Sequence, residues 1–219
     1  MRPPARLLPA LLAVTLVAAS PETPLTAHWK STVTVEGARP GDKLQEAEVW
    51  RDGGRMRIED RTPGGVQTNL VSDGGDAFVW EVGKTVGVRM TEGAARKRGR
   101  PVHDYVRRVD QIRTKGKLVG EEKVDGHACD VYAYETPQDG KGTYWLARDL
   151  KGFPVRVVIE RSVMSPYRGK PIDTVKLEYR NRDVQVPARV PEELLEPPGD
   201  VQFQDAAEIF TNLPKAVPH

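Results

Sequence analysis

Apolar and polar residues alternate with a period of two along most of the chain, which predicts β-strands. The pattern is clearest at residues 29–35, where Trp, Ser, Val and Val alternate with Lys and Thr. Strands with one apolar and one polar face are typical of an antiparallel sheet that packs on one side. Residues 77–80 and 144–147 are apolar on both faces, which predicts central or covered strands. Alternation recurs in three further runs, at residues 55–59, 155–160 and 175–180, although Val158 interrupts the polar face of the second.

Six turn signals separate these runs. Each contains a glycine next to an Asp, a Lys or a second Gly, and glycine supplies the positive φ that tight hairpin turns need. A chain of antiparallel hairpins is therefore the predicted organisation. The signals lie at residues 52–54, 73–75, 83–84, 125–126, 139–140 and 151–152.

Residues 101–114 follow a different period. Their apolar positions recur every three or four residues and would share one face of a helix, with Pro101 in its first turn and Gly116 past its end. Shorter helices are predicted at residues 192–195 and 206–213. The apolar face of the long helix would consist of Val102, Tyr105, Val106, Val109 and Ile112, and its polar face of Arg107, Arg108 and Asp110.

An open sheet needs a cover over its apolar face, and the 101–114 helix is the strongest candidate. We therefore expect a mainly β protein with a few helices: a strongly curved antiparallel sheet or unclosed β-barrel with a helical lid. Such a design can leave an apolar cavity between its layers. Seven large side chains would either line this cavity or pack as ordinary core: Trp29, Trp50, Met56, Phe78, Trp80, Tyr144 and Trp145.

The N-terminus has the features of a secretory signal peptide. Two arginines precede the apolar residues 7–19, which fall short of the roughly 20 residues that a membrane-spanning helix needs. Small residues at positions 17 and 19 predict cleavage between Ala19 and Ser20, and no cysteine follows the cut, which excludes a lipoprotein. We expect a periplasmic protein with a single domain over residues 20–213 and a frayed tail over residues 214–219.

The length indicates one domain, and the net charge argues against a nucleic-acid-binding protein. The chain has 219 residues, enough for one domain with a sizeable core. It contains 33 Lys and Arg and 31 Asp and Glu, and the signal peptide holds two arginines and no acid, so the mature chain has 31 of each. A net charge of zero gives no overall field that would recruit nucleic acid.

Two segments carry local charge of opposite sign. Residues 96–108 hold six basic residues and one acid, and would either meet anionic headgroups, a phosphate-bearing ligand or an acidic partner, or form a solvated loop and helix face. Residues 183–208 hold seven acids and one arginine. They would pair with the basic segment, receive another protein, or remain a solvated surface.

The sequence has no recognisable catalytic or metal motif. A nucleophile elbow, a zincin helix, a phosphate loop and paired carboxylates are all missing, and the four His are scattered. His127 and Cys129 would share one face of a strand, but two ligands do not make a zinc site. A catalytic Cys–His pair would need an activated thiolate. We expect Cys129 to be a buried free thiol, and we expect no enzyme, no metal and no cofactor.

Five stretches of the sequence resemble the LolA-like superfamily of periplasmic proteins, which includes the outer-membrane lipoprotein carrier and lipoprotein-sorting relatives. Each is a hairpin pattern rather than a catalytic signature, and a strand here begins close to the signal where the carriers begin with a helix. Membership in the wider superfamily is therefore the favoured interpretation. The stretches are residues 48–59 (EVWRDGGRMRIE), 120–132 (GEEKVDGHACDVY), 143–156 (TYWLARDLKGFPVR), 175–181 (VKLEYRN) and 187–199 (PARVPEELLEPPG).

The resemblance implies an unclosed β-barrel with a helical lid and an apolar cavity that accepts acyl chains. On this basis the expected function is that of a periplasmic binding or carrier protein for a lipid or an acylated lipoprotein, with peripheral membrane contact and a link to lipoprotein sorting. The alternative is an envelope protein-interaction or stress-sensor domain that uses the same fold without transporting lipid.

Overall fold

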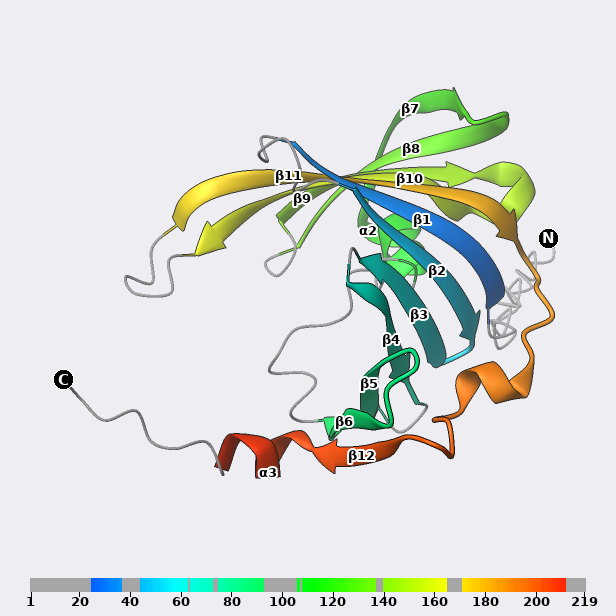
Figure 1. Ribbon diagram of the computed structural model, residues 1–219. Coiled ribbons are helices and arrows are strands. Elements are labelled where there is room, and N and C mark those ends of the chain that lie inside the picture. The colour runs from blue at the N-terminus through cyan, green and yellow to red at the C-terminus, as the bar shows by residue number, and fades with distance from the viewer. Residues whose placement is uncertain are drawn as a thin grey trace, which may run out of the picture.

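The computed structural model describes most of the chain, in eight stretches: residues 25–36, 44–62, 64–72, 75–92, 106, 108–136, 140–164 and 171–211. These residues form one sheet of 12 strands. Figure 1 shows the sheet bent into an arch that is open on one side, with a short helix inside the bend.

Consecutive strands are neighbours through most of the sheet. The strands are β1 (Thr26–Glu36), β2 (Leu44–Asp52), β3 (Arg55–Thr62), β4 (Gly65–Val71), β5 (Ala77–Glu81), β6 (Val86–Met90), β7 (Lys117–Val124), β8 (His127–Thr136), β9 (Gly140–Ala147), β10 (Phe153–Met164), β11 (Pro171–Gln185) and β12 (Gln202–Asp205). The helical segments are α2 (Val109–Lys115), η2 (Arg148–Leu150), η3 (Glu192–Leu195) and α3 (Ala206–Thr211).

Two antiparallel meanders make up the sheet. The spatial order is β12-β6-β5-β4-β3-β2-β1-β11-β10-β9-β8-β7, so β1 and β11 join the two meanders at the centre. Every neighbouring pair is antiparallel except β12, which runs parallel to β6. The predicted fold class is confirmed, since the sheet is strongly curved and does not close.

The turn signals fall between neighbouring strands, as the sequence predicts. The β7–β8 hairpin is the clearest case, because its two turn residues, Asp125 and Gly126, have φ of 47° and 94°. Two central residues with positive φ match the right-handed twist of the flanking strands.

The concave face of the central strands carries the main core. Inward-facing side chains of β1–β3 and β9–β11 pack there together with two residues of the α2 region. Trp29 is fully buried and meets Phe153 edge to face, with ring centroids 5.0 Å apart. The core consists of Ala27, Trp29, Val33, Ala47, Val49, Met56, Ile58, Val106, Ile112, Tyr144, Leu146, Phe153, Val157, Ile159 and Tyr179.

Helix α2 is shorter than the helix that the sequence predicts over residues 101–114. It begins at Val109 and ends at Lys115, and residues 101–105 and 107 lie outside the described part of the chain. Val106 and Ile112 are buried in the main core, Val109 is half-buried against it, and Asp110 is exposed. These positions of the apolar stripe therefore face the concave side of the sheet.

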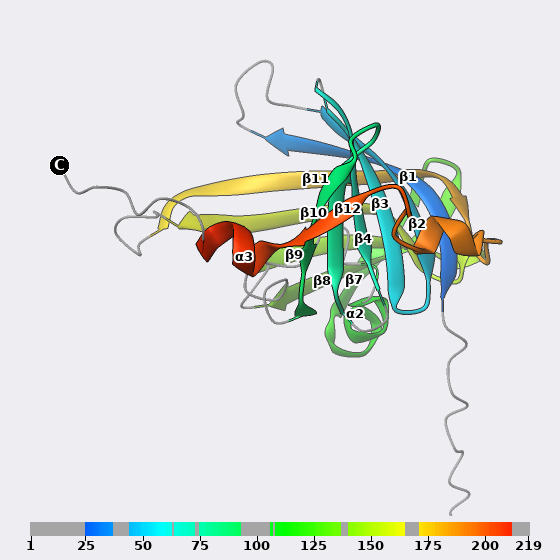
Figure 2. The same ribbon diagram turned by 60° about the horizontal axis from the view of Figure 1, so that its bottom comes forward.

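The C-terminal segment crosses the convex side of the first meander, a feature that sequence patterning does not predict (Figure 2). Phe203 of β12 packs edge to face on Phe78 and Trp80, with centroids 5.2 and 5.8 Å away. It lies directly over Gly87, where a Cβ would be 2.6 Å from the Phe203 ring. η3 adds the buried Leu195, and the Leu194 carbonyl oxygen accepts a hydrogen bond from Arg57.

Gly152 offers a test of how α2 is attached. Its φ is 75°, and a Cβ there would overlap the Arg113 guanidinium, which donates a 2.9 Å hydrogen bond to the Lys151 carbonyl oxygen. We expect Gly152→Ala to lower the free energy of unfolding by about 2–3 kcal/mol, because about 1–2 kcal/mol of left-handed backbone strain adds to this displacement.

Gly126→Ala is the matched control, because its φ is also positive and nothing lies within 4 Å of the added Cβ. It should show the backbone strain alone, about 1–2 kcal/mol. Chemical denaturation of both variants measures the difference, and equal losses would contradict a role for the Arg113 contact.

Candidate functional site

A second apolar strip continues the concave face beyond the main core. Ile58 pairs with Asn69, Asn69 with Val79, and Val79 with Val88, so these side chains share the face of Ile58. Four members of the strip are half-buried and lie outside the main core cluster: Val71, Ala77, Val79 and Val88. The described residues of α2 lie mainly against β8 and β7, at the other end of the sheet.

Polar side chains cross the concave face in a single row beside this strip. We call this set the polar row, and the register places its members next to one another on β11, β1, β2, β3, β4 and β5: Asn181, Ser31, the small Ala47, Asp60, Gln67 and Glu81. Asn181 and Ser31 are each 2% exposed, Asp60 is half-buried, and Gln67 and Glu81 are exposed. The polar row therefore runs from the core to solvent.

Asp60 occupies the middle of the polar row. Gln45 Nε2 donates a hydrogen bond to Asp60 Oδ1 at 3.2 Å, and Asn69 Nδ2 donates one to Oδ2 at 3.0 Å. Burial raises the pKa of the Asp60 carboxyl, while these two hydrogen bonds act in the opposite direction. Among the described residues no Lys, Arg or His pairs with it, so the carboxylate has amide partners and no countercharge.

The buried end of the polar row has polar atoms without partners. Ser31 Oγ and Trp29 Nε1 are buried, and neither has a hydrogen-bond partner within the part of the chain that the structure describes. The two residues lie two positions apart on β1, so both side chains point to the concave face. Both groups are hydrogen-bond donors, so they are complementary to an acceptor oxygen.

The seven predicted lining residues lie on two faces of the sheet. Trp29, Met56 and Tyr144 belong to the core on the concave face, where each is almost fully buried. The other four, Trp50, Phe78, Trp80 and Trp145, point to the convex face. Adjacent strand residues such as Tyr144 and Trp145 face opposite sides, so the seven residues do not share one face of the sheet.

The convex aromatic residues all pack on other side chains. Trp50 stacks on His28 with centroids 5.3 Å apart, and Phe78 and Trp80 both pack edge to face on Phe203. Trp145 belongs to a small convex core with Val131 and Cys129. Its Nε1 donates a 2.6 Å hydrogen bond to Glu122, and the Arg156 guanidinium lies 4.4 Å from the centre of its ring. These rings stabilise the outside of the sheet.

The predicted lid residues are only partly described. Val106, Val109 and Ile112 lie against the main core, while Val102 and Tyr105 lie outside the described residues. Whether any lining or lid residue contacts a ligand remains a prediction.

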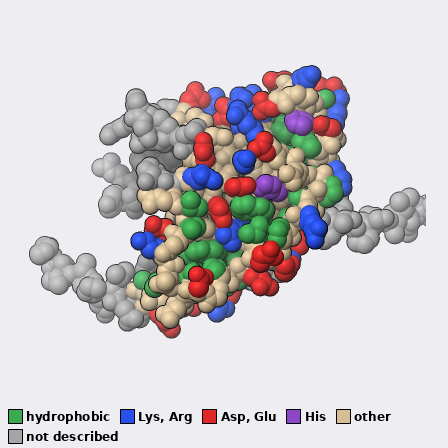
Figure 3. Space-filling view, turned by 45° about the vertical axis from the view of Figure 1, so that its right-hand side comes forward, with side chains coloured by type: hydrophobic (Ala, Val, Ile, Leu, Met, Phe, Trp, Pro, Cys, Tyr) green, Lys and Arg blue, Asp and Glu red, His purple; other side chains and the backbone are tan. Residues whose placement is uncertain are grey.

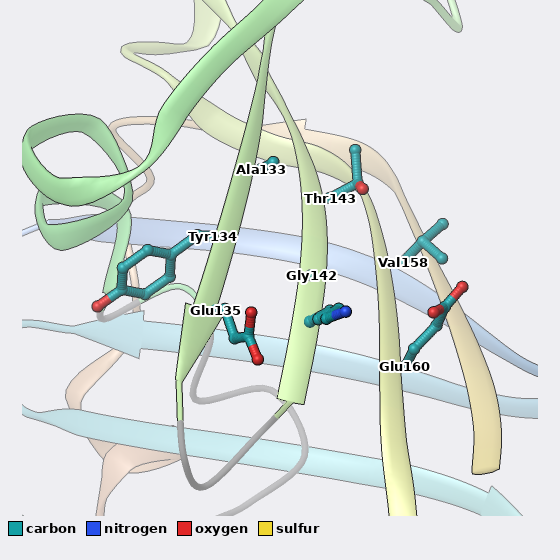
Figure 4. A pocket seen from close by; sticks show the side chains of 8 residues that line it. Ala133, Tyr134, Glu135, Gly142, Thr143, Val158 and Glu160 are labelled. Carbon is teal, nitrogen blue, oxygen red and sulfur yellow. The ribbon is translucent and has the colours of Figure 1, made fainter.

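Two hollows on the convex face are lined by mixed polar side chains. One, of about 420 Å³, lies over β8, β9 and β10 (Figure 4), and the other, of about 480 Å³, lies over β1, β2, β3 and β11. Lys141, Glu135 and Glu160 line the first, and Lys30 and Arg61 with several carboxylates line the second. Neither offers a continuous apolar wall for a lipid tail.

Charges of both signs are mixed over the surface, and Figure 3 shows this on one face. Much of the basic segment 96–108 lies outside the described residues. In the acidic segment, Asp183 pairs with Lys30 at 2.9 Å and Glu192 pairs with Arg55. The acidic residues described in ion pairs therefore find basic partners on β1 and β3.

Cys129 is a buried free thiol, as the sequence predicts, and burial raises its pKa. Its Sγ lies 3.5 Å from the His127 carbonyl oxygen, while the His127 ring pairs with Asp149 at 2.8 Å. Within the described residues, no three His, Cys, Asp or Glu side chains are grouped as metal ligands. No helix in the described stretches has the length and apolar character to span a membrane.

The opposite pKa shifts of Asp60 and Asp183 give a pH test. The pKa of Asp60 is raised in the folded state, so protonation favours folding and the stability of wild type relative to Asp60→Asn should rise as pH falls from 7 to about 4. The Lys30 hydrogen bond and charge lower the pKa of Asp183, so stability relative to Asp183→Asn should fall over the same range. Thermal unfolding against pH measures both, and parallel trends would contradict this assignment.

No family model and no curated protein matches the sequence. Among solved structures, the chain is similar to an uncharacterized conserved protein from Thermus thermophilus, with 13% identity, 81% of this chain and 90% of that chain covered, and a TM-score of 0.49. It is similar to lipoprotein LppX of Mycobacterium tuberculosis, with 13% identity and a TM-score of 0.43. The match covers 76% of this chain and 89% of LppX. It is also similar to a LolA superfamily protein from Nitrosomonas europaea, with 11% identity and a TM-score of 0.36. The match covers 80% of this chain and 91% of that protein. The LolA-like family that the sequence motifs resemble is thus represented among these structures.

Proposed function

We propose that this chain is a periplasmic binding or carrier protein that holds lipid tails, or the acyl chains of lipoproteins, against the concave face of its sheet. The observation that carries the proposal is the apolar strip on β4–β6, which continues the concave face outside the main core. Each methylene that leaves water contributes about 0.8 kcal/mol, so a tail of ten methylenes gains about 8 kcal/mol before the costs of association.

Helix α2 is suited to act as a lid. It has only seven residues and no side-chain cap at its N-terminus, and a helix this short depends on packing for its stability. Burial of Val106 and Ile112 and the hydrogen bond from Arg113 to Lys151 hold it in place. A short helix that depends on side-chain packing can open locally at modest cost, which a tail needs in order to enter.

Export and the absence of catalysis are part of the same proposal. Residues 1–19 would direct the chain to the periplasm and be removed before Ser20. A carrier of this kind needs no metal, cofactor or catalytic residue. Its place in lipoprotein sorting follows from the LolA-like resemblance.

A protein-interaction or sensor domain is the second candidate. It is favoured by the filled core around Trp29, Met56 and Tyr144, which leaves those side chains no open space. Crosslinking in the periplasm distinguishes the two functions. A reproducible protein partner without bound lipid would support the second candidate.

Native mass spectrometry of the secreted protein, extracted gently from its own periplasm, tests the carrier function directly. We expect a population with added mass that matches a lipid or acylated peptide and is released by organic solvent. Repeated recovery of ligand-free protein, together with no binding of added lipid, would contradict the proposal.

Val109→Asp tests the lid. Val109 is half-buried against the main core, so a carboxylate there should loosen α2 and speed both the uptake and the release of a dansyl-labelled fatty acid several-fold. Gln111→Asp is the matched control, because Gln111 is exposed on the same helix. Stopped-flow fluorescence measures both variants, with circular dichroism to confirm folding. Equal rates in the two variants would argue against α2 as the lid.

A further inference from the structure

The polar row lies where an amphiphile on the apolar strip would place its head. Asp60 and Gln67 pair across β3 and β4, one row away from Ile58 and Asn69. Residues on neighbouring rows of the same face are about 7 Å apart along the strand. A tail that lies over Val79 and Val88 therefore brings its polar end to Asp60 within the length of a headgroup.

The open end of the polar row is complementary to a cation. Asp60 is half-buried, and among the described residues only amides donate hydrogen bonds to it; Glu81 lies in the same row two strands further on. The Glu81 carboxylate leans over Gly65 of β4, where a Cβ would lie 3.3 Å from its Oε1. A half-buried carboxylate without a countercharge is costly, and a positively charged head that sits between Asp60 and Glu81 offsets that cost.

The buried end of the polar row is complementary to an acceptor oxygen. Ser31 Oγ and Trp29 Nε1 are two buried donors on this face that have no hydrogen-bond partner within the part of the chain that is described. Only Ala47 lies between Ser31 and Asp60 in the row, so no long side chain separates the donors from the carboxylate. Both donors belong to the packed region, so an oxygen atom reaches them only if that packing opens over β1.

We propose that the polar row binds the head of the amphiphile, and that the head it fits carries an ammonium group next to an ester or amide carbonyl. The carbonyl oxygen accepts hydrogen bonds from Ser31 and Trp29, and the ammonium group lies against Asp60. Ser31 and Asp60 are two strand spacings apart, about 10 Å, which the head spans with a contact of about 3 Å at each end. This inference rests on the proposed carrier function and names the ligand class of the same face.

Three amphiphiles with the same alkyl length separate the two contacts. The methyl ester of dodecyl betaine carries an ammonium group between its tail and an ester carbonyl, dodecyltrimethylammonium has the ammonium alone, and dodecyl sulfate is an anion. Calorimetric titration below micellar concentrations should give wild-type affinities in that order. We expect about fivefold between the first two and about tenfold between the second and third.

Two variants test the carbonyl contact and the ammonium contact separately. Ser31→Ala should lower the affinity for the betaine ester toward that for dodecyltrimethylammonium, and Asp60→Asn should abolish the preference for the ammonium group over sulfate. Glu81→Gln, at the exposed end of the row, should reduce that preference in the same direction if Asp60→Asn does not fold. Glu46→Gln is the matched control, because Glu46 lies on β2 beside Gln45 but lines the convex hollow.

The outcomes separate this inference from the carrier function. If none of the three amphiphiles binds, both are overturned. If all three bind equally, or if dodecyl sulfate binds best, the carrier function stands and the assignment of the head is wrong. If Asp60→Asn and Glu81→Gln keep the wild-type preference for the ammonium group over sulfate, the assignment of the head is also wrong.

Discussion

The antiparallel pairing of β1 with β11 is the constraint on which the concave face depends. It joins strands from opposite ends of the chain, with Val33 opposite Tyr179 and Ser31 opposite Asn181. The buried Asn181 amide also donates a 2.6 Å hydrogen bond to the Pro154 carbonyl oxygen, which ties β11 to β10. Closing so long a loop is entropically costly, so this seam needs the burial of Trp29 and its neighbours to be stable.

Once the seam forms, the two meanders share one concave surface. The second meander supplies Tyr144, Phe153 and much of the main core, and α2 closes over that side. The first meander supplies the apolar strip, and the C-terminal segment supports it from the convex side through Phe203. The second meander is thus packed on its concave side by the main core and α2, and the first meander is packed on its convex side by the C-terminal segment. This division leaves the concave side of β4–β6 apart from the main core.

The strands and turns could be predicted from the sequence because both are local properties. Alternation with a period of two sets each strand, and glycine with a positive φ sets the turns, as Asp125 and Gly126 show. The strand at residues 202–205 alternates over a few residues only, and its parallel pairing with a distant strand is not a local property of the sequence. Its place depends on Phe203 filling the space over Gly87.

The candidate site was harder to predict because it depends on register and on which side of the sheet is concave. Alternation alone separates Tyr144 from Trp145, but it does not say which of them faces inward. The polar row has no signal in the sequence, since its residues come from six strands and are aligned only by pairing. Ser31 alternates with polar neighbours like an ordinary strand residue, and only the structure shows that its hydroxyl is buried without a partner among the described residues.

The most direct test of the account is to map where a tail contacts the protein. A fatty acid with a diazirine near the end of its chain, bound to the intact protein and activated by light, labels the residues that it touches. Peptide mass spectrometry should find the adducts on β4–β6, at Val71, Val79 and Val88. Adducts confined to convex residues such as Trp50 and Trp145 would contradict the claim that the concave face holds the ligand.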